Sequence, residues 1–380
     1  MKPADYYRGR EQTYLKHFFL ERYLERVTYN IGSFAKDFVY VDGFSGPWKS
    51  DETLQDTSFM IAIEKLREVR AGLATGGKTP RIRCLFIESD AAAFRALDKV
   101  VQSVTDIEIR AIHGQFEAAI PEFLRFVGTA FALVFIDPTG WSGFGLKRIA
   151  AILQHRPGEV LVNFMFDHIN RFLEDSRPEI SASFTELFGG PGWEIATKAT
   201  ARREDSIVEF YRERMRTAGS FAHVTSTRIL KPTADRAYFY LIYGTRHPKG
   251  LREFRAVEKQ AVEEQERVRL AAKQDNRVER SGQNELFAAA VASSGPSPFT
   301  EERARQRHSA RTRLHSLLLS RSIILYEDAL TSLLEMPLVW ESDVKQLIAE
   351  LRDSGELEVR GLKMRERTPK EGHFLVHRKA

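Results

Sequence analysis

The chain has 380 residues, of which 43% are hydrophobic and 29% charged, and this composition excludes an intrinsically disordered protein. Lys and Arg number 57 against 52 for Asp and Glu, so the net charge of +5 permits contact with nucleic acid without requiring it. The single cysteine, Cys84, excludes an intrachain disulfide framework and a cysteine-rich metal site, and its apolar surroundings predict a buried thiol.

The first residues, MKPADYYRGREQ, contain no apolar core of a signal peptide. No stretch of the sequence is long enough and apolar enough to span a bilayer. Together with the single cysteine, these features favour a reducing compartment. We therefore expect a cytoplasmic protein without a membrane partner.

Residues 11–29 carry apolar side chains at helical spacing, which predicts an amphipathic helix within an N-terminal helical cap over residues 1–36. Short apolar runs and helical patterns then alternate, as is typical of βαβ units in a parallel, doubly wound sheet. The predicted strands are FVYVDGF, RIRCLFIESD, IEIRAIHG, FALVFIDPTG and EVLVNFMF.

Two later runs, AHVTSTRIL and RAYFYLIYGT, flank a short segment that contains Pro and Asp. They predict an antiparallel hairpin that closes the sheet. Five parallel strands followed by such a hairpin are the outline of a Rossmann-like class I methyltransferase. We therefore expect an α/β domain of this kind over residues 37–247.

The texture of the sequence changes after this domain. A highly charged helical stretch and the linker ASSGPSPFT predict a connecting segment over residues 248–299. Residues 300–380 read as three helices followed by two strands, which predicts a winged-helix domain. Ser342 is the expected N-cap of the third helix, and Gly355 its expected end.

Ligands of a doubly wound sheet bind beyond the carboxyl ends of its strands, near the point where the strand order reverses. Glycines after the first strand would let backbone N–H groups approach a ligand, although a plain strand-to-helix turn is the alternative. A carboxylate that ends the second strand can accept hydrogen bonds from both ribose hydroxyls of a nucleoside cofactor, or be a solvated strand-end acid. The candidates are Asp42, Gly43, Phe44, Ser45, Gly46, Glu88 and Ser89, with Gln115 after the third strand for an adenine edge.

The fourth strand ends in FIDPTGW, where Pro138 fixes φ and forces the chain to leave the sheet. The stretch resembles the Asp-Pro-Pro-Tyr element of amino-methyltransferases, with Thr139 at the second proline and Trp141 one place after the aromatic position. The candidate catalytic residues are Asp137, Pro138, Thr139 and Trp141. His113 has no second ligand at metal spacing, so we expect no metal site.

The first two-thirds of the chain resemble the three-Cys-motif partner proteins, a bacterial and phage-associated family with a methyltransferase-like Rossmann fold. The segments that carry the resemblance are EQTYLKHFFLERYL, YVDGFSGPW, FIESD, FIDPTGW, LVNFMFDHINRF and YGTRHPKGLREF.

This resemblance implies that S-adenosylmethionine (SAM) binds at the matching residues, Asp42, Gly43, Gly46, Glu88 and Asp137. The resemblance also implies a partner protein with a three-cysteine, radical-SAM-like motif. The single cysteine of this chain cannot itself hold such a cluster. Lys16 on the first helix could pair with the methionine carboxylate of the cofactor, or be an ordinary solvated lysine.

The C-terminal domain offers candidates for contact with DNA or RNA. Winged helices commonly bind DNA with one helix in the major groove and a basic wing over the phosphates. Basic hairpins also dock proteins, so this alternative stays open. The candidates are Lys345 and Gln346 on the third helix, and Arg360, Lys363, Arg365 and Arg367 on the wing.

We therefore expect a SAM-dependent methyltransferase-like protein that acts on or with nucleic acid together with a three-cysteine-motif partner. Two alternatives remain. The chain could be a non-catalytic scaffold that binds a nucleotide, or a DNA-binding regulator that uses the winged helix.

Overall fold

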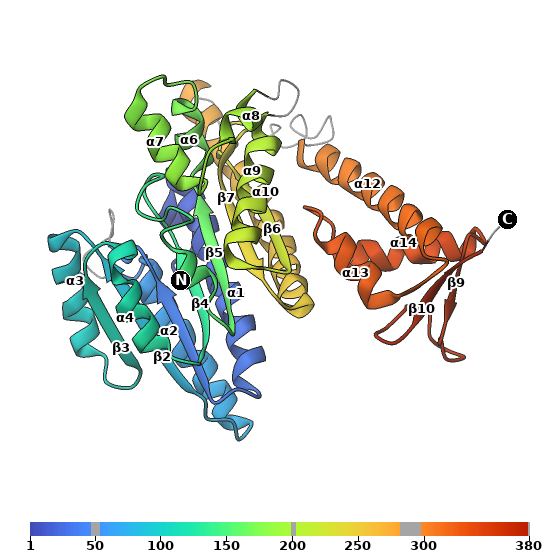
Figure 1. Cartoon of the computed structure of the whole chain (residues 1–380), viewed down its shortest axis with the longest axis horizontal. Helices are drawn as coiled ribbons and strands as arrows, with labels where there is room; N and C mark the ends of the chain where they lie inside the picture. Colours follow the sequence, from blue (N-terminus) through green and yellow to red (C-terminus); the bar gives the residue numbers. More distant parts are fainter. Residues whose placement is uncertain (47–53, 199–202, 282–297, 379–380) are drawn as a thin grey trace. The chain divides into compact units, whose positions relative to one another are not determined.

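The computed structural model describes residues 1–46, 54–198, 203–281 and 298–378 (Figure 1). The last two residues of the YVDGFSGPW motif and most of the predicted linker lie outside these described residues. The chain divides into two compact units, Met1–His247 with Glu264–Arg269 (unit 1), and Pro248–Glu263 with Leu270–Ala380 (unit 2). Among the described residues, no helix combines the length and the apolarity needed to cross a membrane.

Unit 1 is built on a seven-stranded sheet in the order β3-β2-β1-β4-β5-β7-β6. Strands β1 to β5 pair in parallel, and β7 runs antiparallel to both β5 and β6. The predicted parallel sheet with its closing hairpin is thus confirmed. The strands are β1 (Asp37–Asp42), β2 (Arg81–Glu88), β3 (Glu108–His113), β4 (Phe131–Ile136), β5 (Gly158–Phe164), β6 (His223–Leu230) and β7 (Ala237–Thr245).

Helices cover both faces of this sheet. Val39 and Val41 of β1 point to one face and Phe38 and Tyr40 to the other, and all four are fully buried. The helices and 3-10 turns are η1 (Ala4–Tyr7), α1 (Glu11–Gly32), α2 (Ser58–Thr75), α3 (Ala91–Ser103), η2 (Phe116–Ala119), α4 (Ile120–Val127), α5 (Ala150–Leu153), α6 (Phe166–Phe172), α7 (Pro178–Leu187), α8 (Trp193–Thr197) and α9 (Arg203–Gly219).

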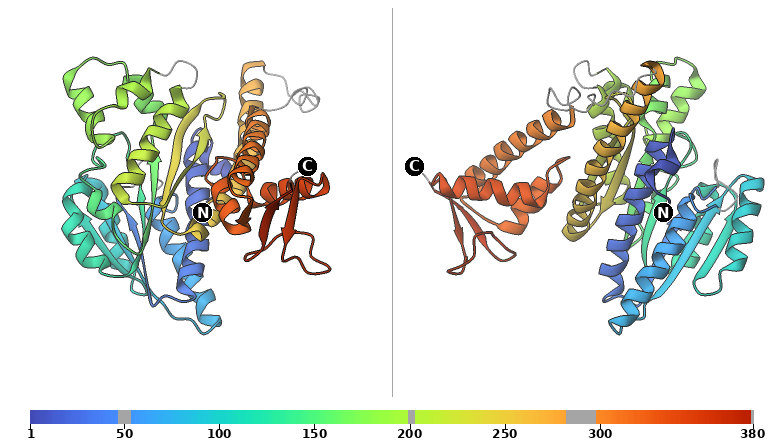
Figure 2. Two further views of the ribbon diagram at one scale, coloured as in Figure 1. Left: turned by 45° about the vertical axis from the view of Figure 1, so that its right-hand side comes forward. Right: turned by 180° about the vertical axis from the view of Figure 1, so that it is seen from behind.

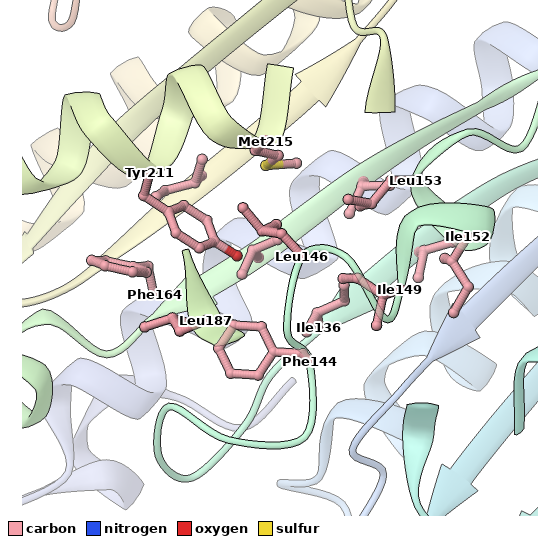
Figure 3. Close-up of a cluster of buried hydrophobic side chains, with 14 of the residues drawn as sticks. Ile136, Phe144, Leu146, Ile149, Ile152, Leu153, Phe164, Leu187, Tyr211 and Met215 are labelled. Atoms are coloured by element: carbon pink, nitrogen blue, oxygen red, sulfur yellow. The ribbon is translucent and has the colours of Figure 1, made fainter. Parts of the chain in front are cut away.

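The valine face of the sheet packs into one large apolar cluster. Figure 3 shows Phe164, at the end of β5, beside Tyr211 of α9, and Ile136, at the end of β4, beside Phe144 and Ile149. These side chains are all buried, so their packing on the valine face holds the ends of β4 and β5 rigidly. Strand ends that are fixed in this way can position polar side chains on the opposite face.

Helices α1 and α2 lie side by side on that opposite face (Figure 2). The buried Tyr23 hydroxyl of α1 bonds to the Glu159 carboxylate of β5 at 2.7 Å and to the Tyr243 hydroxyl of β7 at 2.6 Å. Burial raises the pKa of both tyrosines well above the ordinary value, so both remain protonated. This network fixes α1 across the sheet, and Lys16 lies about two helical turns before Tyr23.

Unit 2 contains a three-stranded sheet in the order β8-β10-β9. Strand β8 is only three residues long and was not among the predicted strands. The elements are α10 (Pro248–Ser281, of which 264–269 belong to unit 1), α12 (Pro298–Ser320), β8 (Ile323–Leu325), α13 (Tyr326–Leu334), α14 (Glu341–Asp353), β9 (Leu357–Arg360) and β10 (Phe374–His377).

Helix α14 starts two residues earlier than an N-cap at Ser342 would place it. It begins at Glu341, so Ser342 lies inside the first turn and its prediction as the N-cap is wrong. The helix start is instead marked by Asp343, whose carboxylate accepts the Trp340 N–H at 2.9 Å. The predicted end is confirmed, because Gly355 follows the helix with a φ of +81° that a side chain would strain.

The first part of α10 belongs to the core of unit 2. Arg255 is fully buried, donating to the Leu334 carbonyl at 2.8 Å and to the Glu258 carboxylate at 2.6 Å. The indole N–H of Trp340 donates to the same carboxylate at 3.1 Å. A buried charge needs such a complete set of partners, so this network ties residues 248–263 to α13 and α14.

Candidate functional site

The loop after β1 is bonded to the strands on both sides. Its three amide N–H groups, of Gly43, Phe44 and Ser45, are all satisfied within the protein, so they are not presented to a ligand as the sequence analysis expected. They donate in order to the Phe135 carbonyl of β4, the Asp42 carboxylate and the Ile87 carbonyl of β2, at 2.9, 3.0 and 2.9 Å.

Gly43 serves packing. An ideal Cβ at this position would lie only 2.7 Å from the ring of Phe116, so a side chain would displace the ring. The ring of Phe44 packs against the same ring in a tilted arrangement, with centroids 5.5 Å apart. Gly46 is half-buried and is the last described residue before the segment 47–53. The small residues therefore let the loop lie flat across the strand ends.

Asp42 ends β1 with a fully buried carboxylate. Burial raises its pKa to about 6, against the opposing effect of hydrogen bonds from the Ser58 hydroxyl and the Phe44 N–H. The Ser58 bond is 2.6 Å long. The nearby negative charge of Asp137 raises the pKa further. The raised pKa means that the Asp42 carboxyl group titrates at mildly acidic pH.

Asp137, directly after β4, meets a lysine and an amide. Its Oδ2 accepts a hydrogen bond from Lys16 Nζ of α1 at 2.5 Å, and its Oδ1 accepts one from Asn163 Nδ2 of β5 at 2.6 Å. The side chains of Lys16 and Asp137 are only 15% and 11% exposed. The structure therefore brings together two predicted site residues, Lys16 and Asp137, that are 121 positions apart in the sequence.

Asn163 is a site residue that the sequence analysis quoted within LVNFMFDHINRF without assigning it a role. It is 2% exposed, and its Oδ1 is buried without a hydrogen-bond partner among the described residues. The available signal was an amide side chain directly after the apolar run of residues 160–162 in the strand. Such a residue is costly to bury, so it usually has a specific partner.

Glu88 ends β2 beside the β1 loop, because the preceding Ile87 carbonyl accepts the Ser45 N–H. Glu88 is 4% exposed, and its Oε1 accepts the Asp90 N–H at 2.6 Å. No bond to Oε2 is found within the described ranges. One oxygen of this carboxylate is thus used to hold its orientation.

The other predicted cofactor residues lie on the surface near Glu88. Ser89 is exposed, and its carbonyl oxygen is 3.2 Å from Nε2 of His113. Gln115 is exposed at the start of η2, where its carbonyl accepts N–H groups of that turn. Both residues follow strands that pair with one another, since β2 and β3 are neighbours.

The residues after Asp137 differ in their surroundings. Pro138 is buried and Thr139 exposed. The Trp141 indole N–H donates to the Ser183 hydroxyl of α7 at 2.9 Å. Its ring also packs against aromatic side chains of α6 and α7. The ring centroids lie 4.9, 5.0 and 5.2 Å from those of His168, Phe172 and Phe184.

The candidate nucleic-acid residues of unit 2 fall into two groups. Several have acidic neighbours: Lys345 with Glu341, Gln346 with Glu350, and Arg360 with Glu358. The other three side chains are exposed on the segment between β9 and β10, and within residues 298–378 no carboxylate partner is found for them. These three, here called the wing cations, are Lys363, Arg365 and Arg367.

Metal ligands do not gather anywhere in the part of the chain that the structure describes: no group of three His, Cys, Asp or Glu side chains could hold a metal ion. Cys84 is buried, and burial raises the pKa of its thiol. The candidate site of unit 1 is therefore built from carboxylates, one lysine and one amide.

A mostly parallel α/β sheet in this order, with polar groups where the strand order reverses, is the arrangement of doubly wound folds that bind ligands beyond their strand ends. No protein-family model matches the chain, and no curated protein matches it. Among solved structures, the chain is similar to protein LPL1258 from Legionella pneumophila, described as DUF519, at 14% identity over 65% of this chain and 89% of that one, with a TM-score of 0.38.

Two further structures are similar at this level. A putative O-methyltransferase from Klebsiella pneumoniae is 12% identical over 59% of this chain and 78% of that one, with a TM-score of 0.31. A loganic acid methyltransferase with SAH is 9% identical over 96% of this chain and 94% of that one, with a TM-score of 0.30.

Proposed function

We propose that unit 1 binds SAM in the crevice beyond β1, β2 and β4 and transfers its methyl group to an acceptor. The observation that carries this proposal is the presence of three carboxylates, of Asp42, Glu88 and Asp137, at the ends of adjacent parallel strands where the strand order reverses. SAM supplies a methyl group activated by its sulfonium. The residues of the chain then have to bind, orient and exclude water.

The charge of these strand ends suits a cationic cofactor. SAM carries a sulfonium, an ammonium and a carboxylate, so its net charge is positive. Three carboxylates are accompanied by one ammonium, that of Lys16, which is already paired with Asp137. A bound cation would also offset the burial of the Asp42 carboxylate, because an opposite charge nearby favours the ionised form.

Glu88 is the residue that would hold the ribose. Its Oε1 is oriented by the Asp90 N–H, and its Oε2 is left to accept hydroxyl hydrogens. Ser89 and Gln115 would lie along the adenosine, since they follow β2 and β3, the two paired strands on one side of β1. The loop from Asp42 to Gly46 would contribute its shape, because the amide groups of Gly43, Phe44 and Ser45 are used within the protein.

The acceptor would bind on the Asp137 side of the crevice. Asp137 can accept a hydrogen from the reacting group, and Pro138 and Thr139 continue the same strand end. Trp141 would form a fixed wall of this part of the crevice, because its indole N–H and its ring are both held by α6 and α7. A preset wall of this kind positions an acceptor without a loop movement.

We also propose a protein partner with a three-cysteine, radical-SAM-like motif. The proposal is supported by the resemblance to the three-Cys-motif partner proteins, carried by EQTYLKHFFLERYL at the start of α1 and by the strand-end motifs. With one buried cysteine, this chain would leave any cluster to the partner. Co-purification with the three-cysteine protein, followed by mass analysis of bound nucleosides, would test the pairing.

A second candidate function, contact with DNA or RNA, is favoured by the wing cations. The order of α12, β8, α13, α14, β9 and β10 supports the expected winged helix, and the wing cations are exposed on the segment between β9 and β10. Exposed cations without carboxylate partners can bind phosphates without first breaking an ion pair. We infer that unit 2 binds nucleic acid, or alternatively a protein, through the segment that carries the wing cations.

The test of the methyltransferase proposal has two steps. Titration calorimetry with SAM should show binding, and radiolabel from SAM should then be transferred to bulk DNA or RNA. Asp137→Ala should abolish transfer while leaving SAM affinity within about tenfold of the parent. Asp205→Ala, an exposed acid on α9, is the matched control.

Each outcome of these steps favours one of three functions, those of a methyltransferase, a scaffold or a regulator. Binding without transfer to any acceptor would favour the scaffold, and duplex binding without SAM binding would favour the regulator. Absence of SAM binding by the parent chain would contradict the proposed function.

A further inference from the structure

Asn163 is held by one end of its amide group. Its Nδ2 donates to Asp137 Oδ1 at 2.6 Å and lies 3.4 Å from the Met165 sulfur. Its Oδ1, at the other end of the group, is buried and has no hydrogen-bond partner in the described part of the chain. The residue as a whole is 2% exposed, so bulk water does not satisfy this oxygen.

The orientation of the amide follows from electrostatics. If the amide were reversed, Oδ1 would face a carboxylate oxygen of Asp137, and two acceptors would repel each other. Lys16 Nζ donates to the other oxygen of Asp137, so each oxygen of this side chain acts as an acceptor. The series Lys16, Asp137, Asn163 therefore fixes which end of the amide is left without a partner.

The free end is a strong acceptor for an N–H group. A donor group that bonds to an anion polarises the rest of its amide, and this strengthens Oδ1 as an acceptor. A buried acceptor without a partner is costly, and binding a ligand that donates to it removes the cost. Lys16 bonds to Oδ2 of Asp137 and makes no hydrogen bond to Asn163 Oδ1 in the described part of the chain.

We propose that Asn163 Oδ1 accepts a hydrogen bond from an N–H group of the ligand in this crevice, and that Lys16 and Asp137 act as positioning residues for it. The inference rests on the proposed function, because that function brings an N–H donor to the crevice. The methionyl ammonium of the cofactor is one such donor, and a base amino group of a DNA or RNA acceptor is another. The chemistry required of Asn163 is the same for both.

Asn163→Leu tests the proposal, because leucine is similar in size and has no polar atom. Asn170→Leu, an exposed asparagine on α6, is the matched control. The probes are S-adenosylhomocysteine (SAH), which keeps the methionyl ammonium, and methyl transfer from SAM to bulk DNA or RNA. SAH affinity is measured by calorimetry, and KM and kcat by radiolabel transfer.

The two sources of the N–H group give different results. If the donor is the cofactor ammonium, Asn163→Leu should weaken SAH binding by about tenfold. If the donor belongs to the acceptor, SAH affinity should stay within about twofold of the parent, while the acceptor KM rises about tenfold. Asn170→Leu should match the parent in both measurements.

Failure of the inference is separate from failure of the proposed function. If the parent does not bind SAH, the proposed function fails and the inference fails with it. If the parent binds SAH, unchanged SAH affinity and unchanged KM in Asn163→Leu overturn the inference alone. If the parent binds SAH but transfers no methyl group, unchanged SAH affinity is sufficient to overturn it.

A double-mutant comparison tests the positioning role of Lys16. Lys16→Met should impair the same step as Asn163→Leu, either by weakening SAH binding or by raising the acceptor KM. Lys16→Arg should restore the parent value, because a cation keeps Asp137 in place. The variant with both Lys16→Met and Asn163→Leu should lose no more than Asn163→Leu alone. Additive losses would show that Lys16 contacts the ligand by itself and would overturn its positioning role.

Discussion

Asp42→Asn should stabilise unit 1, and the gain should depend on pH. The folded chain keeps the Asp42 carboxyl fully buried, and burial raises its pKa from 3.8 to about 6. Below pH 3.8 this group is protonated in both folded and unfolded chains. Between the two pKa values, the folded chain holds a proton that the unfolded chain has released, so the free energy of unfolding falls as the pH rises.

The gap of about two pH units corresponds to about 3 kcal/mol above pH 6, at about 1.36 kcal/mol per unit. Asparagine carries no charge, and it can keep both local bonds. Its oxygen can accept the Phe44 N–H, and its amide can donate to the Ser58 hydroxyl. The gain from Asp42→Asn should therefore rise from about 1 kcal/mol at pH 4.5 to about 3 kcal/mol at pH 8.

Urea unfolding, monitored by hydrogen-exchange mass spectrometry of β1 peptides, would measure this gain in the free energy of unfolding for unit 1 by itself. The same variant should bind SAM more weakly, because the crevice loses a negative charge, as expected where a site is maintained at a cost in stability. Ser58→Ala is a useful comparison, since it removes one bond and leaves the charge. A difference between parent and Asp42→Asn that is the same at pH 4.5 and pH 8 would refute the reasoning.

Three further results are expected. Glu88→Gln should weaken SAM binding by about tenfold in calorimetry, because a charged acceptor of hydroxyl hydrogens is lost, and unchanged affinity would argue against the ribose contact. Alanine at all three wing cations of the full chain should flatten the log–log salt dependence of duplex binding by about three, measured by fluorescence anisotropy, and an unchanged slope would remove the wing from the interface. Arg255→Met should destabilise unit 2 by about 3 to 5 kcal/mol in thermal unfolding, because Glu258 stays buried without its cation, and Arg255→Met with Glu258→Leu should recover most of the loss.

Local patterns were sufficient for the sheet of unit 1. Apolar runs such as FALVFIDPTG predict strands because both faces of the sheet are covered, and a residue such as Asp137 at the end of a run marks where the strand stops. The parallel arrangement with its closing hairpin follows from the alternation of strands with helices and from the short segment between β6 and β7. Strand-end positions of candidate residues were therefore readable without a structure.

Short or irregular features were not readable in this way. The three residues of β8 are too few to show a period, and they form a strand because β10 pairs with them. Arg255 reads as one charge in a solvated helix, since its burial comes from Leu334 and Trp340, more than seventy positions further along the chain. Burial of this kind depends on packing between distant segments.

The bonding of the site was decided only by the tertiary structure. The sequence by itself placed Asp42, Glu88 and Asp137 at strand ends, because a strand end is a local property. It did not show that Lys16 would bind Asp137, or that the amides of Gly43 and Ser45 would be used by β4 and β2. Those contacts join positions that are distant in the sequence, and only the packing of α1 on the sheet and the pairing of strands bring their atoms within hydrogen-bond distance.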